Sequence, residues 1–257
     1  MRVAVQLAYD GHLYHGYARQ PHVKTVEGRI IDILTKTGYI TTPKESKFRV
    51  ASRTDKGVSA LGNVVALNTD KNVDNIFEEI NIDDHILFYG IKQVDDDFYP
   101  RYAKLRIYQY YLKDNNYNLE EILLAANFFT GTHNFSNFAR IEEGKNPMRT
   151  IENITIAQED NLFIISFYAQ TFLWNQIRRI INSILKTVEK KIIPDDVQKA
   201  LENHEQKFDF GVAPSEPLVL KDVIYDFDFE HKEKFLRLKK NFEESVFLSI
   251  KNFYCQS

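Results

Sequence analysis

The chain is 257 residues long, and its composition of 44% hydrophobic and 27% charged residues is typical of a folded globular protein and excludes wholesale disorder. No run approaches the roughly 18 consecutive apolar residues that a membrane-spanning helix needs, and the first residues reach charged side chains too early for a signal peptide. A single cysteine, Cys255, excludes an internal disulfide framework and a metal site with several cysteine ligands. These features predict a cytoplasmic protein.

The net charge of −3 is unevenly distributed along the chain. Residues 1–60 contain ten Lys and Arg but only five Asp and Glu, so this segment carries +5 and the remaining 197 residues carry −8. A basic segment suits a polyanionic partner such as nucleic acid, although a solvated surface explains the same asymmetry.

Hydrophobic periodicity predicts an alternation of strands and helices in the first part of the chain. The expected strands cover residues 2–8, 47–51, 63–68 and 86–93. The expected helices cover residues 26–37, where Gly38 supplies a stop signal, and approximately 72–80. This β-α-β-β-α-β order is typical of a ferredoxin-like unit.

A related order recurs in the rest of the chain. We expect a strand at 107–112, a helix at 119–129, a hairpin formed by 151–157 and 162–168, and a long amphipathic helix at 172–188. The charged and aromatic tail after Lys232 is expected to pack back as a final helix or strand. The sequence thus predicts an α+β protein of two ferredoxin-like (RRM-like) halves, residues 1–103 and 104–257, with antiparallel sheets and a cleft between the halves.

Several common chemistries have no signature in the sequence. Neither a GxxxxGK[ST] loop nor a GxGxxG motif is present, so nothing indicates a nucleotide cofactor. His12 and His15 are spaced HxxH, but no third ligand follows nearby, so we expect no metal site. No serine stands in a GxSxG elbow. The remaining candidates are Asp55, which is flanked by cations, several loop tyrosines, and the arginine pair Arg178-Arg179.

The segment ASRTDKGVSALGNVVAL, residues 51–67, places Asp55 between Arg53 and Lys56 and between two predicted strands. Nearby cations favour the ionised carboxylate, and a turn between strands can aim it into a cleft. An ionised and oriented carboxylate can serve as a nucleophile or as a base. An Asx-type turn completed by Lys56 and Gly57 explains the same residues without any catalysis.

This segment closely resembles the catalytic-loop motif of the TruA family of tRNA pseudouridine synthases, which has the form GRTDxGVxAxGQV. Five further motifs of the family have counterparts in the same order. They are YDGHLYHGYARQP (9–21), RIYQYYL (106–112), GTHNFSNF with RTI (131–138 and 149–151), QTFLWNQIRRII (170–181) and GVAPSEPLVL (211–220), the last of them in its archaeal form. Small departures are Tyr17 for the common Trp, Ser52 for Gly, Ser59 for His and Asn63 for Gln, none of which touches the Arg-Thr-Asp core.

The resemblance implies an enzyme that isomerises uridine to pseudouridine in the anticodon stem-loop of tRNA, at positions 38, 39 and 40. It also implies a central catalytic cleft, a homodimer as the tRNA-binding form, and no metal or organic cofactor. Two alternatives remain: an RNA-binding protein that keeps the fold without the chemistry, and a synthase that acts on another RNA. The intact Arg53-Thr54-Asp55 core argues against the first alternative, since a pure binder does not need the aspartate.

The resemblance also assigns roles to individual residues. The family's essential catalytic aspartate corresponds to Asp55. Arg53 corresponds to the arginine that holds the space of the flipped-out base, and Tyr108 to the tyrosine that stacks on the uracil. Arg178 matches the helix arginine that pairs with the aspartate and keeps it ionised. Leu218 matches a residue that contacts the base, although core packing explains a leucine there equally well.

Basic residues are candidates for contacts with tRNA phosphates, which supply the salt-dependent part of RNA affinity. Those in the basic N-terminal segment are Arg19, Lys24, Lys47, Arg49 and Lys56. Arg179 is a further candidate, although it lies on the polar side of its helix, where a solvated surface charge is an equal explanation.

Overall fold

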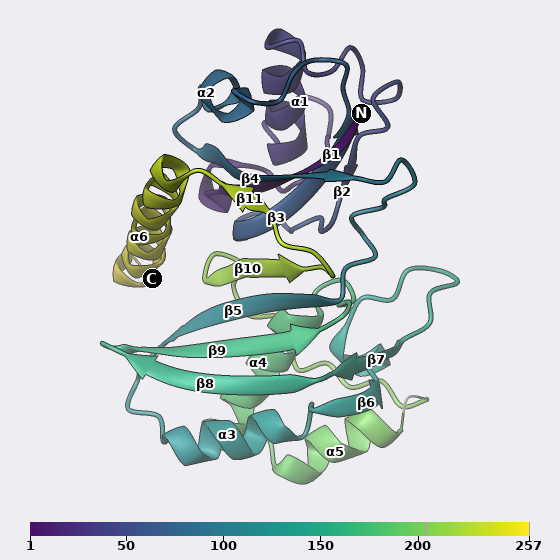
Figure 1. Ribbon diagram of the computed structural model, residues 1–257. Helices are drawn as coiled ribbons and strands as arrows, with labels where there is room; N and C mark the ends of the chain where they lie inside the picture. The colour runs from purple at the N-terminus through teal and green to yellow at the C-terminus, as the bar shows by residue number, and fades with distance from the viewer. Residues whose placement is uncertain (204, 257) are drawn as a thin grey trace. The chain divides into compact units, whose positions relative to one another are not determined.

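The computed structural model describes residues 1–203 and 205–256 and divides into two compact units (Figure 1). Unit 1 comprises Met1–Lys104 together with the chain from Val219 onward, and unit 2 comprises Leu105–Leu218. The division expected from the sequence assigns residues 219–257 to the second half, whereas in the structure the segment from Val219 onward packs with the first. This segment therefore completes unit 1 and does not extend unit 2.

Unit 1 is built on an antiparallel sheet with a ferredoxin-like strand order. Its strands are β1 (Arg2–Tyr9), β2 (Arg49–Val50), β3 (Ser59–Asn68), β4 (Ile86–Val94), β10 (Leu218–Ile224) and β11 (Glu230–His231). The order is β11-β4-β1-β3-β10, and β2 pairs with the other end of β3. The antiparallel order β4-β1-β3-β2 is that of a ferredoxin-like fold, as the sequence predicts. In the added strand β10, Val219 and Leu220 pair in parallel with Ser59 and Ala60.

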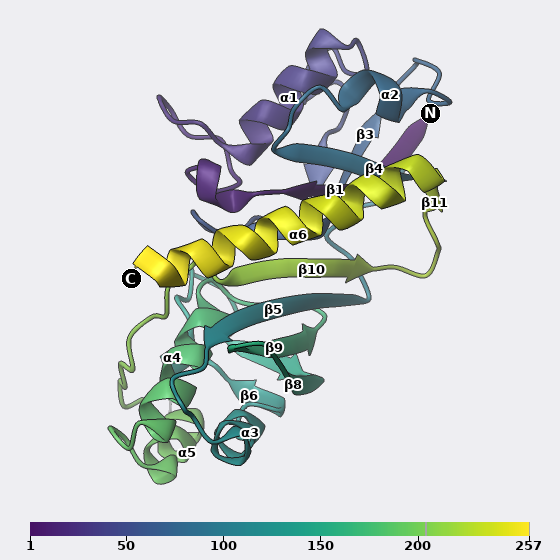
Figure 2. The ribbon, with the colours of Figure 1, turned by 90° about the vertical axis from the view of Figure 1, so that its left-hand side faces the viewer.

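In the described part of unit 1, the sheet is accompanied by the α-helices α1 (Val26–Lys36), α2 (Ile76–Ile80) and α6 (Glu233–Gln256) and by a short 3-10 helix, Gly11–Leu13. Helix α1 begins where the Thr25 hydroxyl accepts a hydrogen bond from the Gly28 amide at 3.3 Å, and the chain leaves it at Gly38. Helices α1 and α2 lie on one side of the β1–β4 ribbon and α6 on the other (Figure 2). Every residue of β1 is buried, because the sheet is covered on both faces. The tail after Lys232 is thus a helix, one of the two forms expected.

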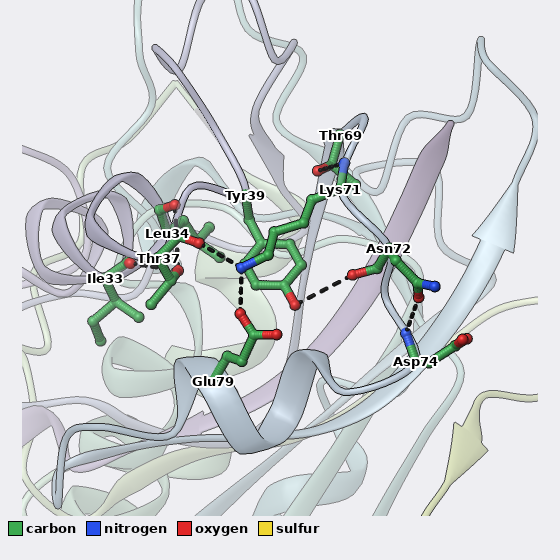
Figure 3. A network of polar contacts seen from close by, with 9 residues as sticks. All are labelled: Ile33, Leu34, Thr37, Tyr39, Thr69, Lys71, Asn72, Asp74 and Glu79. Carbon is green, nitrogen blue, oxygen red and sulfur yellow. Dashed lines mark hydrogen bonds and ion pairs between the residues drawn. The ribbon is translucent and has the colours of Figure 1, made fainter.

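A polar network joins the end of α1 to α2 (Figure 3). The Lys71 ammonium donates to the carbonyl of Thr37 at 2.8 Å and forms an ion pair with Glu79. It also lies 4.5 Å from the centroid of the Tyr39 ring, a cation–π contact. One lysine therefore ties the end of α1, the chain after β3 and helix α2 together.

In unit 2, strands β5, β9 and β8 pair antiparallel in that order, and β6 and β7 form a separate two-stranded hairpin. Its strands are β5 (Leu105–Lys113), β6 (Gly131–Asn134), β7 (Met148–Ile151), β8 (Asn153–Glu159) and β9 (Leu162–Ala169). Its helices are α3 (Leu119–Asn127), α4 (Gln176–Val188) and α5 (Pro194–Glu202). The predicted hairpin is present as β8 and β9, which turn at Asp160. The hairpin β6-β7 and helix α5 are not among the elements expected from the sequence.

Hydrophobic periodicity predicts the buried face of helix α4 correctly, but it places the start of the helix too early. The predicted apolar stripe is buried at Ile177, Ile180, Ile181 and Ile184. The helix begins at Gln176, however, and not at Phe172, because Asn175 adopts a left-handed conformation with φ 61°. The fold is α+β with antiparallel sheets, as the sequence predicts.

Candidate active site

The segment around Asp55 is a loop between β2 and β3 that ends in a tight turn. The Val58 amide donates to the carbonyl of Asp55 at 3.2 Å, and Gly57, the third residue of this turn, has φ 85°. A positive φ at the third residue is the mark of a type II turn and favours glycine. Lys56 and Gly57 therefore form the middle of a backbone turn that begins at Asp55. Asp55 is half-buried, while Arg53 and Lys56 are exposed on either side of it.

The N-terminal motif holds this loop in place. The Tyr17 amide donates to the carbonyl of Thr54 at 3.0 Å, and the hydroxyls of Tyr9 and Thr54 lie 2.8 Å apart in a buried hydrogen bond. Gly16 is buried against the loop, where a β-carbon would lie 3.2 Å from the Lys56 amide nitrogen and 3.5 Å from the carbonyl carbon of Asp55. Backbone and side-chain contacts thus fix the residue on each side of the carboxylate.

Asn63 holds the other end of the loop from within β3. Its side chain is fully buried and hydrogen-bonded at both ends. The amide nitrogen donates to the carbonyl of Ser52 at 2.9 Å and to the Tyr9 hydroxyl at 3.2 Å. The amide oxygen accepts from the backbone amides of Ser52 at 3.3 Å and Val64 at 2.9 Å. Asparagine, at the position where the family commonly has glutamine, therefore satisfies every one of these buried groups.

Tyr17 stands where tryptophan is common in the family and forms part of the wall behind the loop. The side chain is fully buried, and its ring centroid lies 6.0 Å from that of Tyr9. Burial, with smaller contributions from Tyr9 and Glu27, raises the pKa of Tyr17 well above its ordinary value. The phenol therefore stays neutral and serves to pack the loop.

The basic residues of the N-terminal segment that are proposed for RNA contacts are exposed in unit 1: Arg19, Lys24, Lys47, Arg49 and Lys56. Arg19 is held loosely by an ion pair with Glu27 at 3.7 Å, and its side chain is 58% exposed. The Lys24 ammonium lies 5.6 Å from the centroid of the Tyr14 ring. Their charges face solvent, as phosphate contacts require.

Tyr108 lies in β5, in unit 2. It is 9% exposed, and its ring meets that of Phe172 edge-on at a centroid distance of 5.3 Å. Tyr110 and Tyr111 of the same strand are 1% and 7% exposed. Burial alone therefore does not single out Tyr108 among the three tyrosines.

Arg178 lies in the first turn of α4 and is anchored by its own unit. Its Nε donates to the carbonyl of Ala213 at 2.8 Å, and another guanidinium nitrogen donates to Oδ1 of Asn175 at 3.1 Å. The Ala213 amide in turn donates to the carbonyl of Arg178 at 3.1 Å. The guanidinium is thus held in one orientation and is not a freely solvated charge.

The neighbouring predicted residues are held differently. Arg179 forms an ion pair with Asp209 at 3.1 Å, and its side chain is 24% exposed. A hydrogen bond from the Gly211 amide, together with the charge of Arg179, holds the pKa of Asp209 below its ordinary value although burial opposes this. Leu218 is 6% exposed at the first residue of β10, so it packs in the interior.

The predicted residues are divided between the two units. Arg53, Asp55 and Lys56 share one loop of unit 1, and Tyr108, Arg178, Arg179 and Leu218 belong to unit 2. Within residues 1–203 and 205–256, no three His, Cys, Asp or Glu side chains are grouped so that they could hold a metal ion. In the same part of the chain, none of the helices combines the length and apolar character needed to cross a membrane.

A role in positioning the loop was not predicted from the sequence for four residues: Tyr9, Gly16, Thr54 and Asn63. The signal for the first two was present in YDGHLYHG, which matches the two tyrosines and two glycines of a family motif. Their partners lie some 40 residues away, so only the folded chain shows which backbone atoms they contact.

Comparisons with known proteins show the family to which the chain is related. A family model described as tRNA pseudouridine synthase matches residues 125–226. A protein named tRNA pseudouridine synthase A from Thermococcus sibiricus is 40% identical over 88% of this chain and 85% of its own length. The protein of the same name from Thermococcus kodakarensis is 37% identical over 91% of this chain and 89% of its own length. A much weaker similarity, with a TM-score of 0.34 and 15% identity over 69% of this chain and 44% of the other, is to the archaeal box H/ACA sRNP Nop10-Cbf5 complex.

These relatives match most of this chain and most of their own length, so the chain belongs to the class of isomerases that form pseudouridine in RNA. The chain belongs to the TruA family of tRNA pseudouridine synthases, as a member of its archaeal type.

Proposed function

We propose that this synthase converts uridines at positions 38, 39 and 40 of the tRNA anticodon stem-loop into pseudouridine, with Asp55 as the catalytic carboxylate. The observation that supports this role is the loop geometry: Asp55 is half-buried between two exposed cations on a loop that unit 1 fixes at both ends. A group that acts on a substrate has to be held in place in this way, because small displacements of a reacting group are costly. A turn aspartate without a function would not require such support.

The chemistry assigns tasks to the other residues. The uridine has to leave the base stack, its glycosidic bond is broken, and the uracil turns and is rejoined through a ring carbon. Unstacking costs a few kcal/mol, and stacking on an aromatic ring returns about 1–3 kcal/mol per base. We assign the stacking to Tyr108 and the space vacated in the RNA to Arg53. Leu218 is assigned the contact with the other side of the base.

Arg178 is assigned to Asp55, as the cation that keeps the carboxylate ionised. Its anchoring by Ala213 and Asn175 supports this role, since a guanidinium with a fixed orientation loses little entropy when it binds a carboxylate. Asp55 belongs to unit 1 whereas Tyr108 and Arg178 belong to unit 2, so the proposal requires residues of both units to act on one uridine.

Affinity for tRNA is assigned to exposed cations of the basic N-terminal segment, with Arg19, Lys24 and Lys56 as backbone contacts. Each phosphate that is neutralised adds roughly 0.7–0.9 to the slope of log affinity against log salt concentration. Arg179 is a weaker candidate because Asp209 already pairs with it. We further propose a homodimer as the tRNA-binding form and the cytoplasm as the compartment.

The test compares unmodified tRNA transcripts treated with the wild type, Asp55→Ala and Asp55→Asn. Pseudouridine is mapped by carbodiimide-based primer extension, and tRNA binding is measured separately on filters. We expect the wild type to modify positions 38–40, both variants to be inactive, and both to bind tRNA within about tenfold of the wild type because the phosphate contacts lie elsewhere.

Asp70 provides a matched control. It is an exposed acid that follows the far end of β3, about 30 Å along the strand from the loop. Asp70→Ala should therefore keep full activity. Modification at other positions would refute the anticodon assignment, and an active Asp55→Ala would refute the role of the carboxylate.

Tyr108→Phe and Tyr108→Leu separate stacking from proton transfer. The phenylalanine variant should keep its activity, since the ring remains, and the leucine variant should lose about tenfold or more, in line with a stacking contribution of about 1–3 kcal/mol. If both variants kept the activity of the wild type, Tyr108 would have no role in the site.

A further inference from the structure

Trp174 is the single tryptophan of the chain, and it is exposed. It lies in the loop between β9 and α4, and its side chain keeps 43% of its accessible surface. Indole is the largest aromatic side chain and is usually buried or used for contacts. An exposed tryptophan is therefore a candidate for contact with another molecule.

Arg140 lies against this ring. Its guanidinium carbon is 4.2 Å from the centroid of the indole, a close cation–π contact. The Arg140 amide also donates to the carbonyl of Trp174 at 2.8 Å, which makes an isolated antiparallel bridge between the two residues. The backbone bridge therefore holds the two residues side by side, so the contact between their side chains does not depend on two flexible segments.

The loop that carries Trp174 is itself fixed. The Leu173 amide donates to the side-chain oxygen of Gln176 at 2.8 Å, and the Gln176 amide donates to the carbonyl of Leu173 at 3.1 Å. Asn175, the next residue after Trp174, accepts a hydrogen bond from Arg178. Trp174 is therefore held one residue away from an anchor of the arginine that we assign to Asp55.

Arg140 is exposed, and in the described part of the chain its guanidinium lies against the indole and not against a carboxylate. The pair thus combines an aromatic face with an available positive charge. That combination matches an unpaired nucleotide, since its base can stack on the ring and its phosphate can bind the cation. A purely apolar partner would have no use for the guanidinium.

We propose that Trp174 and Arg140 form a stacking platform for an unpaired base of the substrate tRNA, a nucleotide other than the uridine that is isomerised. The platform rests on the proposed function, because it presumes that tRNA binds to unit 2. Stacking on a π-face tolerates any base, so the platform recognises an unstacked nucleotide and not a sequence. It would hold the RNA beside Arg178 while the target uridine is out of the stack.

The lone tryptophan makes a direct test possible. Asp55→Ala protein, which leaves the tRNA unmodified, is titrated with a tRNA transcript while indole fluorescence is excited selectively above the tyrosine absorption. Stacking of a base on the indole should quench this fluorescence, and the quenching should saturate with the same curve as filter binding. A fully paired RNA duplex of similar length should bind without comparable quenching.

Variants give an independent readout. Trp174→Ala should weaken tRNA binding about thirtyfold, the middle of the range for loss of one stacked base, and Trp174→Phe should restore most of it. Arg140→Ala should weaken binding and lower the salt slope by nearly one. Leu124→Ala, at a residue that is 66% exposed on α3, is the control and should bind like the wild type.

The outcomes separate this proposal from the proposed function. Saturating tRNA without a change in fluorescence, equal quenching by the duplex, or wild-type binding by Trp174→Ala would each overturn the platform. Absence of any tRNA binding would overturn it as well. Quenching by tRNA in a protein whose wild type forms no pseudouridine at positions 38–40 would leave the platform in place and refute the proposed function.

Discussion

Gly16 offers the sharpest test of how the fold holds the loop that carries Asp55. It is buried beneath the loop with φ 90°, and a β-carbon there would lie 3.2 Å from the Lys56 amide nitrogen and 3.5 Å from both the carbonyl carbon of Asp55 and the carbonyl oxygen of Thr54. Gly16→Ala adds one methyl group at this place. We expect it to damage activity more than stability.

Two costs are expected from this substitution. A residue other than glycine with a left-handed backbone costs roughly 1–2 kcal/mol. A contact at 3.2 Å also requires a neighbour to move by a few tenths of an ångström, and the neighbours here are backbone atoms on both sides of the Asp55 side chain. Since a misplacement of about 1 Å can cost about 100-fold in rate, a shift of this size should lower the rate about tenfold.

Gly38→Ala is the matched control. Gly38 has a similar φ of 75° at the end of α1, but nothing lies within 4 Å of the position that its β-carbon would take. Urea denaturation should show that both variants lose about 1–2 kcal/mol of unfolding free energy, while single-turnover pseudouridine formation should fall only in Gly16→Ala. Equal rates in the two variants would refute the view that the N-terminal motif positions Asp55.

Three further predictions concern residues of unit 1. Asn63→Ala leaves several buried groups without partners, so it should lower the unfolding free energy by about 3 kcal/mol in urea titrations, and a loss below about 1 kcal/mol would contradict the hydrogen-bond geometry. Burial, with a smaller contribution from Glu79, raises the pKa of Tyr39 to about 12 from an ordinary value near 10. The folded state therefore favours the neutral phenol, so the contribution of Tyr39 to stability is complete below pH 10 and is lost as the pH rises toward 12. Urea midpoints of the wild type should fall over this range more steeply than those of Tyr39→Phe. Parallel curves for the two proteins would refute the raised pKa of Tyr39. Lys71→Met keeps the aliphatic stem but removes the ion pair and backbone contact of Figure 3, so it should lower the unfolding free energy by about 1 kcal/mol. Lys36→Met, which removes an exposed ion pair within one helix, is the control and should lower it by about 0.3–0.5 kcal/mol. A larger loss for Lys36→Met than for Lys71→Met would contradict this prediction.

Periodicity and short motifs were sufficient for much of the fold. Alternation of apolar residues located β1, β4 and β9, and 3.6-residue spacing located α1 and the buried stripe of α4, because both patterns follow from which face of an element meets the core. The turn at Asp55 was predictable for a similar reason, since a glycine two residues later permits the positive φ that the turn needs. Local chemistry determines these features.

Other boundaries depend on single backbone conformations. The four residues that precede Gln176 fit a helical pattern, but Asn175 is left-handed and the helix starts after it. The hairpin β6-β7 is too short to show a clear alternation, and the predicted strand at 151–157 was in fact the end of one strand and most of the next. Patterns of hydrophobicity do not record such changes because they average over several residues.

The sequence by itself determined the family and singled out Asp55, between its two cations, as the candidate carboxylate, because these are carried by residue types at fixed spacings. The tertiary structure alone decided that the chain from Val219 onward joins unit 1, that Asn63 and Tyr9 hold the loop, and that Arg140 lies on Trp174. The reason is physical: each of these depends on contacts between residues far apart in the chain, and pairing of strands or side chains across that distance is set by how whole elements pack and not by any local pattern.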